Sequence, residues 1–173
     1  MTKALKIKVL EYSLSAKEAK LMKKIVFVCH GNICRSPMAE FVFKRMLTER
    51  GGADKVEVCS MAVSAEELGN PVYPPARAEL LRHGIGCDGK YAVRIGKSDY
   101  EKFDLIICMD DSNLRGLMRL FGGDPDGKIK KLLDYTDRGG SVADPWYTGD
   151  FSEAFSDVCE GCEAVYAHLF ESK

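Results

Sequence analysis

The sequence has no excess of charge of either sign, because 25 Lys and Arg residues stand against 26 Asp and Glu residues in a chain of 173. A chain so close to neutral has no general field that would attract nucleic acid or an anionic membrane, so any anion site must be local. No apolar run approaches the roughly 18 residues that a membrane span requires, and there is no internal repeat or long linker. We therefore expect a single domain with no nucleic acid and no membrane among its partners.

A secretory signal is also lacking, since no charged segment, apolar stretch and small-residue cleavage site precede the cysteines. The seven cysteines are an odd number, which favours free thiols in a reducing, cytoplasmic compartment. Residues 1–21 are lysine-rich and weakly patterned, with the spacing of a helix capping box at Ser15–Glu18. We expect this segment to be an extension outside the core, followed by one domain over residues 22–173.

From residue 24 onward, apolar strand patterns alternate with helical patterns. Strands are predicted at residues 24–29, 55–60, 103–109 and 128–135. The first helix is predicted to begin with Ser36 as its N-cap and Pro37 at its first position, and to end before Gly51. Further helices are predicted at residues 76–83, 110–123 and 151–171. This order predicts an α/β three-layer sandwich, with a central four-stranded parallel sheet and helices on both faces.

The loop after the first strand reads CHGNICRSP over residues 29–37. A tight loop between a strand and a helix start turns backbone N–H groups inward, and the helix dipole adds partial positive charge there. Gly31 and Asn32 tolerate the left-handed backbone that such a curl requires. Arg35 adds a planar, two-pronged donor that matches two oxygens of a phosphate. The loop is therefore predicted to bind a phosphate group beyond the carboxyl end of the first strand, where ligands of such sheets are found.

A nucleophile and an acid are also present. Cys29 faces the predicted anion site, where the N–H dipoles, Arg35 and Ser36 would stabilise its thiolate. Attack of that thiolate on the phosphorus of a phosphate ester would give a cysteinyl phosphate, which water would then hydrolyse. The leaving oxygen needs a proton donor, and Asp144 in the segment ADPWY can supply one from a loop that Pro145 stiffens.

Three segments, VCHGNICRSP, CMDDSNL and ADPWYTGDF, resemble the low-molecular-weight protein tyrosine phosphatases of the bacterial type. The resemblance runs from about Met22 to the end of the chain. It implies catalytic roles for Cys29 as nucleophile, Arg35 as phosphate clamp and Asp144 as general acid and later base. It also implies that no metal or cofactor takes part, and that the substrates are tyrosine-phosphorylated proteins or small aryl phosphates.

The same resemblance assigns binding and supporting residues. The phosphate-binding loop would consist of seven successive residues, His30, Gly31, Asn32, Ile33, Cys34, Arg35 and Ser36. The strained backbone of Asn32 would be held by a network of Ser36, Ser60 and His83. Trp146 and Tyr147 would form an aromatic wall on which an aryl phosphate can stack.

The sequence also departs from the family pattern. Residues 60–63 read SMAV where the family usually has SAGT, and Glu66 aligns with a position that is often aromatic. His30 stands where an aliphatic residue is usual, and it could contact substrate or face solvent. Asp110 and Asn113 keep the family's MD-x-x-N segment, which the resemblance implies is structural.

Two alternative functions use the same scaffold. Arsenate reductases need a further cysteine pair after the third strand, whereas no cysteine lies between Cys108 and Cys159 here. Protein-arginine phosphatases carry threonine at the position of Ile33, so the isoleucine favours phosphotyrosine. A redox role also remains open for Cys34, because a disulfide with Cys29 would protect the nucleophile from over-oxidation.

Two non-phosphatase readings are disfavoured. Cys159 and Cys162 have the spacing of half a zinc site, yet they lie on one predicted helix face without a second pair, which favours buried thiols. A module that only binds anions would normally lack the nucleophile or the acid, and this chain has both.

Overall fold

The computed structural model describes residue 7 and residues 22–171. The expected extension over residues 1–21, with its capping box at Ser15–Glu18, lies outside the described residues except for Ile7. In the part of the chain that is described, no helix has both the length and the apolar character needed to cross a bilayer.

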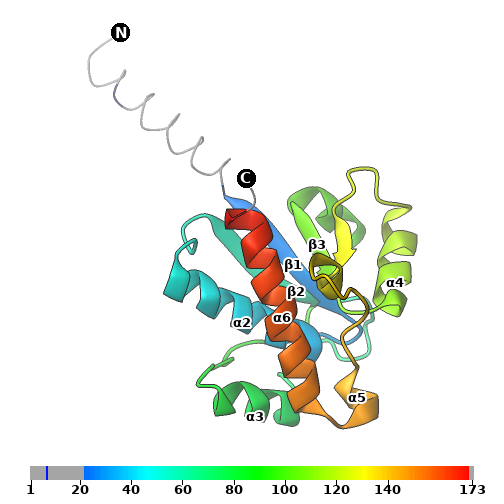
Figure 1. Ribbon diagram of the computed structural model, residues 1–173. Helices are drawn as coiled ribbons and strands as arrows, with labels where there is room; N and C mark the ends of the chain where they lie inside the picture. Colours follow the sequence, from blue (N-terminus) through cyan, green and yellow to red (C-terminus); the bar gives the residue numbers. More distant parts are fainter. Residues whose placement is uncertain (1–6, 8–21, 172–173) are drawn as a thin grey trace.

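The centre of the molecule is one sheet of four strands, β1 (Lys23–Cys29), β2 (Val56–Ala62), β3 (Leu105–Cys108) and β4 (Ile129–Lys131). The strands are all parallel and lie in the order β2-β1-β3-β4 (Figure 1). The register pairs Cys29 with Ala62, so that β1 and β2 end together at one edge of the sheet. This confirms the predicted four-stranded parallel sheet and places the loop 29–37 at its carboxyl edge.

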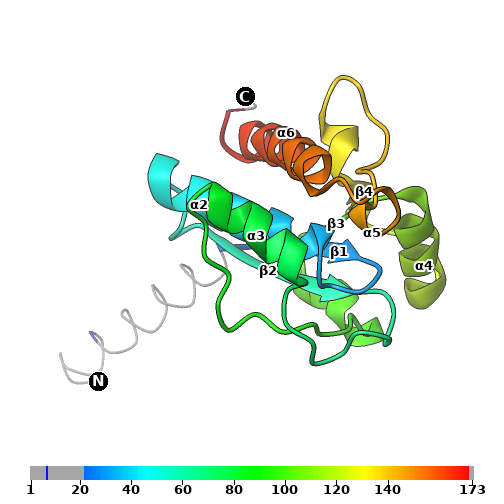
Figure 2. The same cartoon turned by 90° about the horizontal axis from the view of Figure 1, so that it is seen from below.

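Within residues 22–171, seven helical segments connect and cover the strands: α2 (Arg35–Arg50), α3 (Pro74–Arg82), the 3-10 helix η1 (Lys97–Lys102), α4 (Asp111–Phe121), the 3-10 helix η2 (Leu132–Tyr135), α5 (Pro145–Thr148) and α6 (Phe151–Phe170). Figure 2 shows α2, α3 and α6 together on one side of the sheet. Their buried side chains form a core with Ile25 and Phe27 of β1. The alternate residues Val26 and Val28 belong to a second core on the other face, with Leu117 of α4. Because β1 is buried on both faces, its sequence reads as a continuous apolar run.

The predicted fourth strand at 128–135 was wrong in its second half. Only Ile129–Lys131 are extended, and η2 follows at Leu132–Tyr135. Leu132 and Leu133 are both fully buried in the same core. Neighbouring residues of a strand point to opposite faces, so this double burial on one side requires a helical turn.

The start of the first helix also differs from the prediction. Helix α2 begins at Arg35, with Cys34 as its N-cap and no capping hydrogen bond from a side chain. Ser36 is therefore inside the first turn and Pro37 follows it. The hydroxyl of Ser36 points back into the loop, where it contacts Cys29 and Asn32.

Candidate active site

Cys29 is the last residue of β1, and the strand delivers its side chain to the start of the loop. Its Sγ lies 3.0 Å from the Ser36 hydroxyl oxygen and accepts a hydrogen bond of 3.3 Å from the backbone N–H of Asn32. The N-terminus of α2 follows directly in the chain, and its first N–H groups have no acceptor within the helix. These donors and the positive end of the helix dipole favour negative charge at this place, either a thiolate or a bound anion.

The loop owes its curl to Asn32. Its φ is 59°, and it is the one described residue other than glycine with a positive φ. The Asn32 side chain holds this conformation, because its amide donates to the hydroxyls of Ser36 and Ser60, both at 2.9 Å. Its oxygen accepts from the backbone N–H of Val93 at 3.1 Å. Gly31 is not among the residues with a positive φ, but a Cβ there would lie 3.1 Å from the Cγ of Glu67, so a larger residue would displace that side chain.

Arg35 lies at the bottom of the site and is only 2% exposed. Its Nη1 donates to Asp110 Oδ2 at 2.7 Å and to the carbonyl oxygen of Val142 at 3.0 Å, and its Nη2 donates to Asp144 Oδ2 at 3.0 Å. A guanidinium has five N–H donors. Three of them have these partners among the described residues, which leaves the Nε–H and one Nη2–H for an incoming anion.

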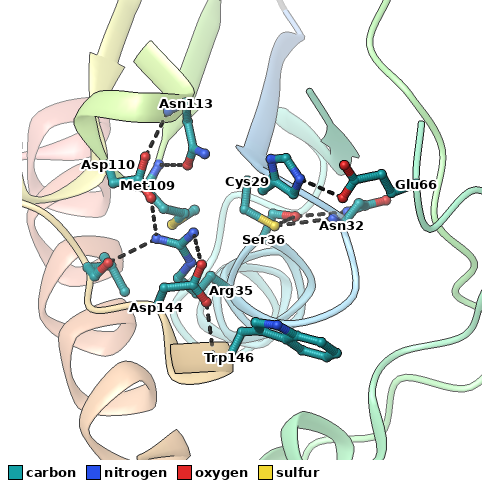
Figure 3. A network of polar contacts seen from close by, with 12 residues as sticks. Cys29, Asn32, Arg35, Ser36, Glu66, Met109, Asp110, Asn113, Asp144 and Trp146 are labelled. Carbon is teal, nitrogen blue, oxygen red and sulfur yellow. Dashed lines mark hydrogen bonds and ion pairs between the residues drawn. The ribbon is translucent and has the colours of Figure 1, made fainter. Parts of the chain in front are cut away.

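The two carboxylates beside Arg35 are fixed by helix starts. Asp144 is the N-cap of α5, and its Oδ1 accepts from the backbone N–H of Trp146 at 3.1 Å. Asp110 is the N-cap of α4 and accepts from the backbone N–H of Asn113 at 2.7 Å. Asp110, expected to be structural, therefore also orients Arg35 directly. Figure 3 shows the guanidinium between the two carboxylates, with Cys29 and Ser36 on the neighbouring side.

A cleft of about 340 Å³ is lined by Cys29, Arg35, Asp110 and Asp144, among others. Trp146 and Tyr147 of α5 form one wall, and both side chains are more than half exposed. The ring of Tyr73 supports Trp146 at a centroid distance of 5.3 Å. The opposite rim is polar, because His30 Nε2 and Glu66 Oε2 lie 2.9 Å apart there. The structure thus places His30 at the rim of the cleft, paired with Glu66, which also departs from the family pattern.

Comparison with known proteins agrees with this geometry. The family model described as low molecular weight phosphotyrosine protein phosphatase matches residues 24–173, which is most of the chain. The chain belongs to this family. Among the relatives of this phosphatase, the protein-tyrosine-phosphatase YfkJ of Bacillus subtilis is 37% identical over 154 residues, which cover 88% of this chain and 99% of YfkJ. The human low molecular weight phosphotyrosine protein phosphatase is 38% identical over 147 residues, covering 82% of this chain and 92% of the human protein.

Solved structures of this phosphatase family share the fold. The crystal structure of YfkJ superimposes with a TM-score of 0.85, covering 88% of this chain and 97% of YfkJ. A Drosophila arginine phosphatase superimposes with a TM-score of 0.78 at 27% identity, covering 87% of this chain and 99% of that protein. The fold is therefore common to relatives named for different phosphorylated side chains.

One expected supporting residue of the phosphatase lies elsewhere. His83 does not bind Asn32 or its hydroxyl partners. It is the C-cap of α3, its Nε2 lies 3.2 Å from Glu79 Oε1, and its ring stacks on Phe155 at a centroid distance of 4.1 Å. The prediction that His83 joins the network was therefore wrong, because packing against α6 holds its ring away from the loop.

Two residues that were not expected from the sequence, Glu40 and Lys90, complete the network in place of His83. The hydroxyl of Ser60 donates to Glu40 Oε2 at 2.5 Å, and the Nζ of Lys90 lies 3.1 Å from the same oxygen. A signal for Glu40 was available, because it lies three and seven positions before the apolar residues Phe43 and Leu47, and so on the same side of the helix as they do. Lys90 gave none, because nothing in its neighbourhood in the sequence ties it to the loop.

The seven cysteines of the phosphatase are all free thiols. Burial raises the pKa of the six other than Cys29, namely Cys34 (to about 12), Cys59 (to about 11), Cys87, Cys108 (to about 12), Cys159 (to about 11) and Cys162. These six therefore remain protonated near neutral pH. Cys162 is fully buried on α6, and its Sγ contacts the carbonyl oxygen of Ala39 at 3.7 Å. In residues 22–171, no three His, Cys, Asp or Glu side chains are grouped so that they could hold a metal ion.

Proposed function

We propose that the chain hydrolyses phosphotyrosine and related aryl phosphates through a cysteinyl-phosphate intermediate. The observation that supports this is the meeting of Cys29, Arg35 and Asp144 in one cleft. Cys29 and Arg35 come from the two ends of one loop and Asp144 from the start of α5. Each supplies one requirement of phosphoryl transfer: a nucleophile, a phosphate clamp and a proton donor. An aromatic wall of Trp146 and Tyr147 beside them suits the ring of the substrate.

In the first step, the phosphate dianion binds the N–H groups of the loop and the two remaining donors of Arg35. The thiolate of Cys29 attacks phosphorus, and the bond to the tyrosyl oxygen breaks. The negative phosphate beside Asp144 favours the protonated carboxyl, which gives its proton to the leaving oxygen. The product tyrosine leaves, and the phosphoryl group stays on Cys29.

In the second step, water replaces the tyrosine. Asp144 is now a carboxylate, and it accepts a proton from the water molecule while the oxygen of that water attacks phosphorus. The S–P bond breaks, inorganic phosphate is released, and the thiolate of Cys29 is regenerated. The Ser36 hydroxyl stabilises that thiolate as the leaving group, as its distance of 3.0 Å from Sγ allows.

Turnover of para-nitrophenyl phosphate in the presence of a metal chelator tests this proposal. The wild-type chain should release nitrophenol, and Cys29→Ser should abolish the release because an alcohol is a far weaker nucleophile than a thiolate. Cys59→Ser is the matched control, because Cys59 lies on β2 and does not line the cleft. Full activity of Cys29→Ser, or no activity of the wild type without added metal, would refute the proposal.

Whether the substrate carries phosphotyrosine or phosphoarginine is a separate question. Ile33 lines the cleft and is 8% exposed, so an apolar surface faces the part of the substrate next to the phosphate. That surface suits an aromatic ring better than a charged guanidinium. We therefore expect faster hydrolysis of a phosphotyrosine peptide than of a matched phosphoarginine peptide. The reverse order would favour an arginine phosphatase.

Because all seven cysteines are free, we place this activity in the reducing cytoplasm.

A further inference from the structure

The chain has a single tryptophan, Trp146, and its ring forms part of the aromatic wall of the cleft. It belongs to α5, a helix of one turn in which Pro145 is the only buried residue. Trp146 is 56% exposed, and exposed side chains ordinarily change rotamer within nanoseconds. A wall that receives the ring of a substrate should be held in place beforehand, because ordering it during binding would weaken the affinity.

Among the described residues, one aromatic ring supports Trp146. It is the ring of Tyr73, at a centroid distance of 5.3 Å and an interplanar angle of 55°. The same ring lies 6.0 Å from that of Phe151, the first residue of α6. Both distances fall in the range over which aromatic pairs attract each other. Tyr73 thus contacts the chain on both sides of the junction between α5 and α6, and so restrains the turn that carries Trp146.

Tyr73 is itself attached to the phosphate-binding loop. Its backbone N–H donates to the carbonyl oxygen of Ile33 at 2.8 Å, and Ile33 is a residue of that loop. The place of the Tyr73 ring is therefore set relative to the place where the phosphate binds. The backbone N–H of Trp146 donates to Asp144 Oδ1 (Figure 3), so the turn that rests on Tyr73 carries both the wall and the general acid.

The helix that begins after Tyr73 does not explain why a tyrosine stands there. Tyr73 is the N-cap of α3, a position that strongly favours a short side chain able to accept a hydrogen bond from the helix. Its side chain makes no such bond. What the tyrosine side chain contributes is its contact with the rings of Trp146 and Phe151.

We propose that Tyr73 is a positioning residue: it holds the Trp146 ring beside the cleft and links this wall to the phosphate-binding loop, so that aryl phosphates are preferred over alkyl phosphates. This inference rests on the proposed function in taking the loop as the site of the phosphate. Tyr73 does not line the cleft and acts through Trp146.

The test compares the binding of benzylphosphonate and methylphosphonate, measured by calorimetry. Both ligands present a phosphonate to the loop and neither is hydrolysed, but only benzylphosphonate carries a ring. The ratio of their dissociation constants therefore reports the contact between ring and wall, and an effect on the loop itself cancels. The wild type should bind benzylphosphonate about tenfold more tightly.

Tyr73→Leu should reduce this preference to about threefold or less, because leucine lacks the ring face that supports Trp146. Tyr73→Phe keeps the ring and should keep the preference. Tyr91→Leu is the matched control, because Tyr91 is exposed and does not line the cleft. When Trp146→Ala is already present, Tyr73→Leu should change the ratio by less than about 1.5-fold, because its effect passes through Trp146.

Fluorescence provides a second measurement. Because Trp146 is the only tryptophan of the chain, the anisotropy of tryptophan fluorescence reports the motion of this ring alone. In the wild type the anisotropy should decay only as the whole protein tumbles. Tyr73→Leu should add a faster decay from rotation of the ring, and Tyr73→Phe should not.

A preference for benzylphosphonate in Tyr73→Leu as large as in the wild type would overturn the inference, and so would equal affinities of the wild type for the two ligands. If Tyr73→Leu does not fold, the wild-type anisotropy decides, since free rotation of Trp146 in the wild type would contradict a supported wall. Failure of the wild type to hydrolyse para-nitrophenyl phosphate would refute the proposed function while leaving the binding comparison readable.

Discussion

The left-handed backbone of Asn32 provides a quantitative test of how the loop is held. Asn32 is 1% exposed and makes three side-chain hydrogen bonds, to Ser36, Ser60 and the N–H of Val93. Each buried bond contributes about 1 kcal/mol net, so Asn32→Gly and Asn32→Ala should both lose about 3 kcal/mol of unfolding free energy.

The two variants then differ through the backbone alone. An alanine held at φ 59° lowers the unfolding free energy by about 1–2 kcal/mol more, because its Cβ is strained there. Glycine accepts this φ, but it costs about 0.5–1 kcal/mol relative to alanine through the entropy of the unfolded chain. The alanine variant should therefore be the less stable of the two by about 0.5–1 kcal/mol.

Urea denaturation followed by circular dichroism measures both differences, and equal slopes for the three proteins ensure that the free energies are comparable. The expected order of stability is wild type, then Asn32→Gly, then Asn32→Ala. If both variants unfolded within about 0.5 kcal/mol of the wild type, the hydrogen-bond network would not be what holds the loop. If alanine were more stable than glycine by about 0.5–1 kcal/mol, the full entropic difference, no strain would be stored at this residue.

Three further predictions concern the chemistry of the cleft. Asp144→Ala should slow esters with poor leaving groups far more than esters with good ones, because only the former need the proton; equal slowing would argue against the acid role. Arg35→Lys should lower kcat/KM about a hundredfold or more, because a lysine cannot replace the fork that binds two carboxylates, a carbonyl and the phosphate; a loss below about tenfold would contradict the clamp. Cys34→Ser should make inactivation by peroxide harder to reverse, because the Cys34 thiol would otherwise condense with the sulfenic acid of Cys29 and release water. Unchanged recovery by added thiol would remove this protective role.

Much of the fold could be predicted because its segments have strong patterns. The continuous apolar run of β1 predicts a strand that is buried on both faces, and it is. The failure at Leu132 and Leu133 has a physical reason, since a short apolar run does not reveal on which side its residues are buried. The one-turn helix α5 was missed although its Asp-Pro start is a typical N-cap followed by proline at the first helical position.

The candidate active site could also be predicted only in part. The loop residues follow one another in the sequence, so their approximate positions could be predicted from the strand and helix that flank them. Asp144 could be assigned by residue type, but its 3.0 Å contact with Arg35 depends on how α5 folds back over the sheet. Lys90 was out of reach, because only the tertiary structure brings it to Glu40. His83 was assigned to the network from the family resemblance, and packing on Phe155 holds it elsewhere.

The covalent intermediate is the central claim, and trapping it is the most direct test. An aryl phosphate carrying radiolabelled phosphate is mixed with the protein, the reaction is quenched within one turnover, and the labelled peptide is sequenced. The label should be on the peptide that contains Cys29, in an amount approaching one phosphoryl group per chain when Asp144→Asn slows the attack of water. Turnover without any label on Cys29 in either protein would contradict the mechanism and indicate direct attack of water on the bound ester.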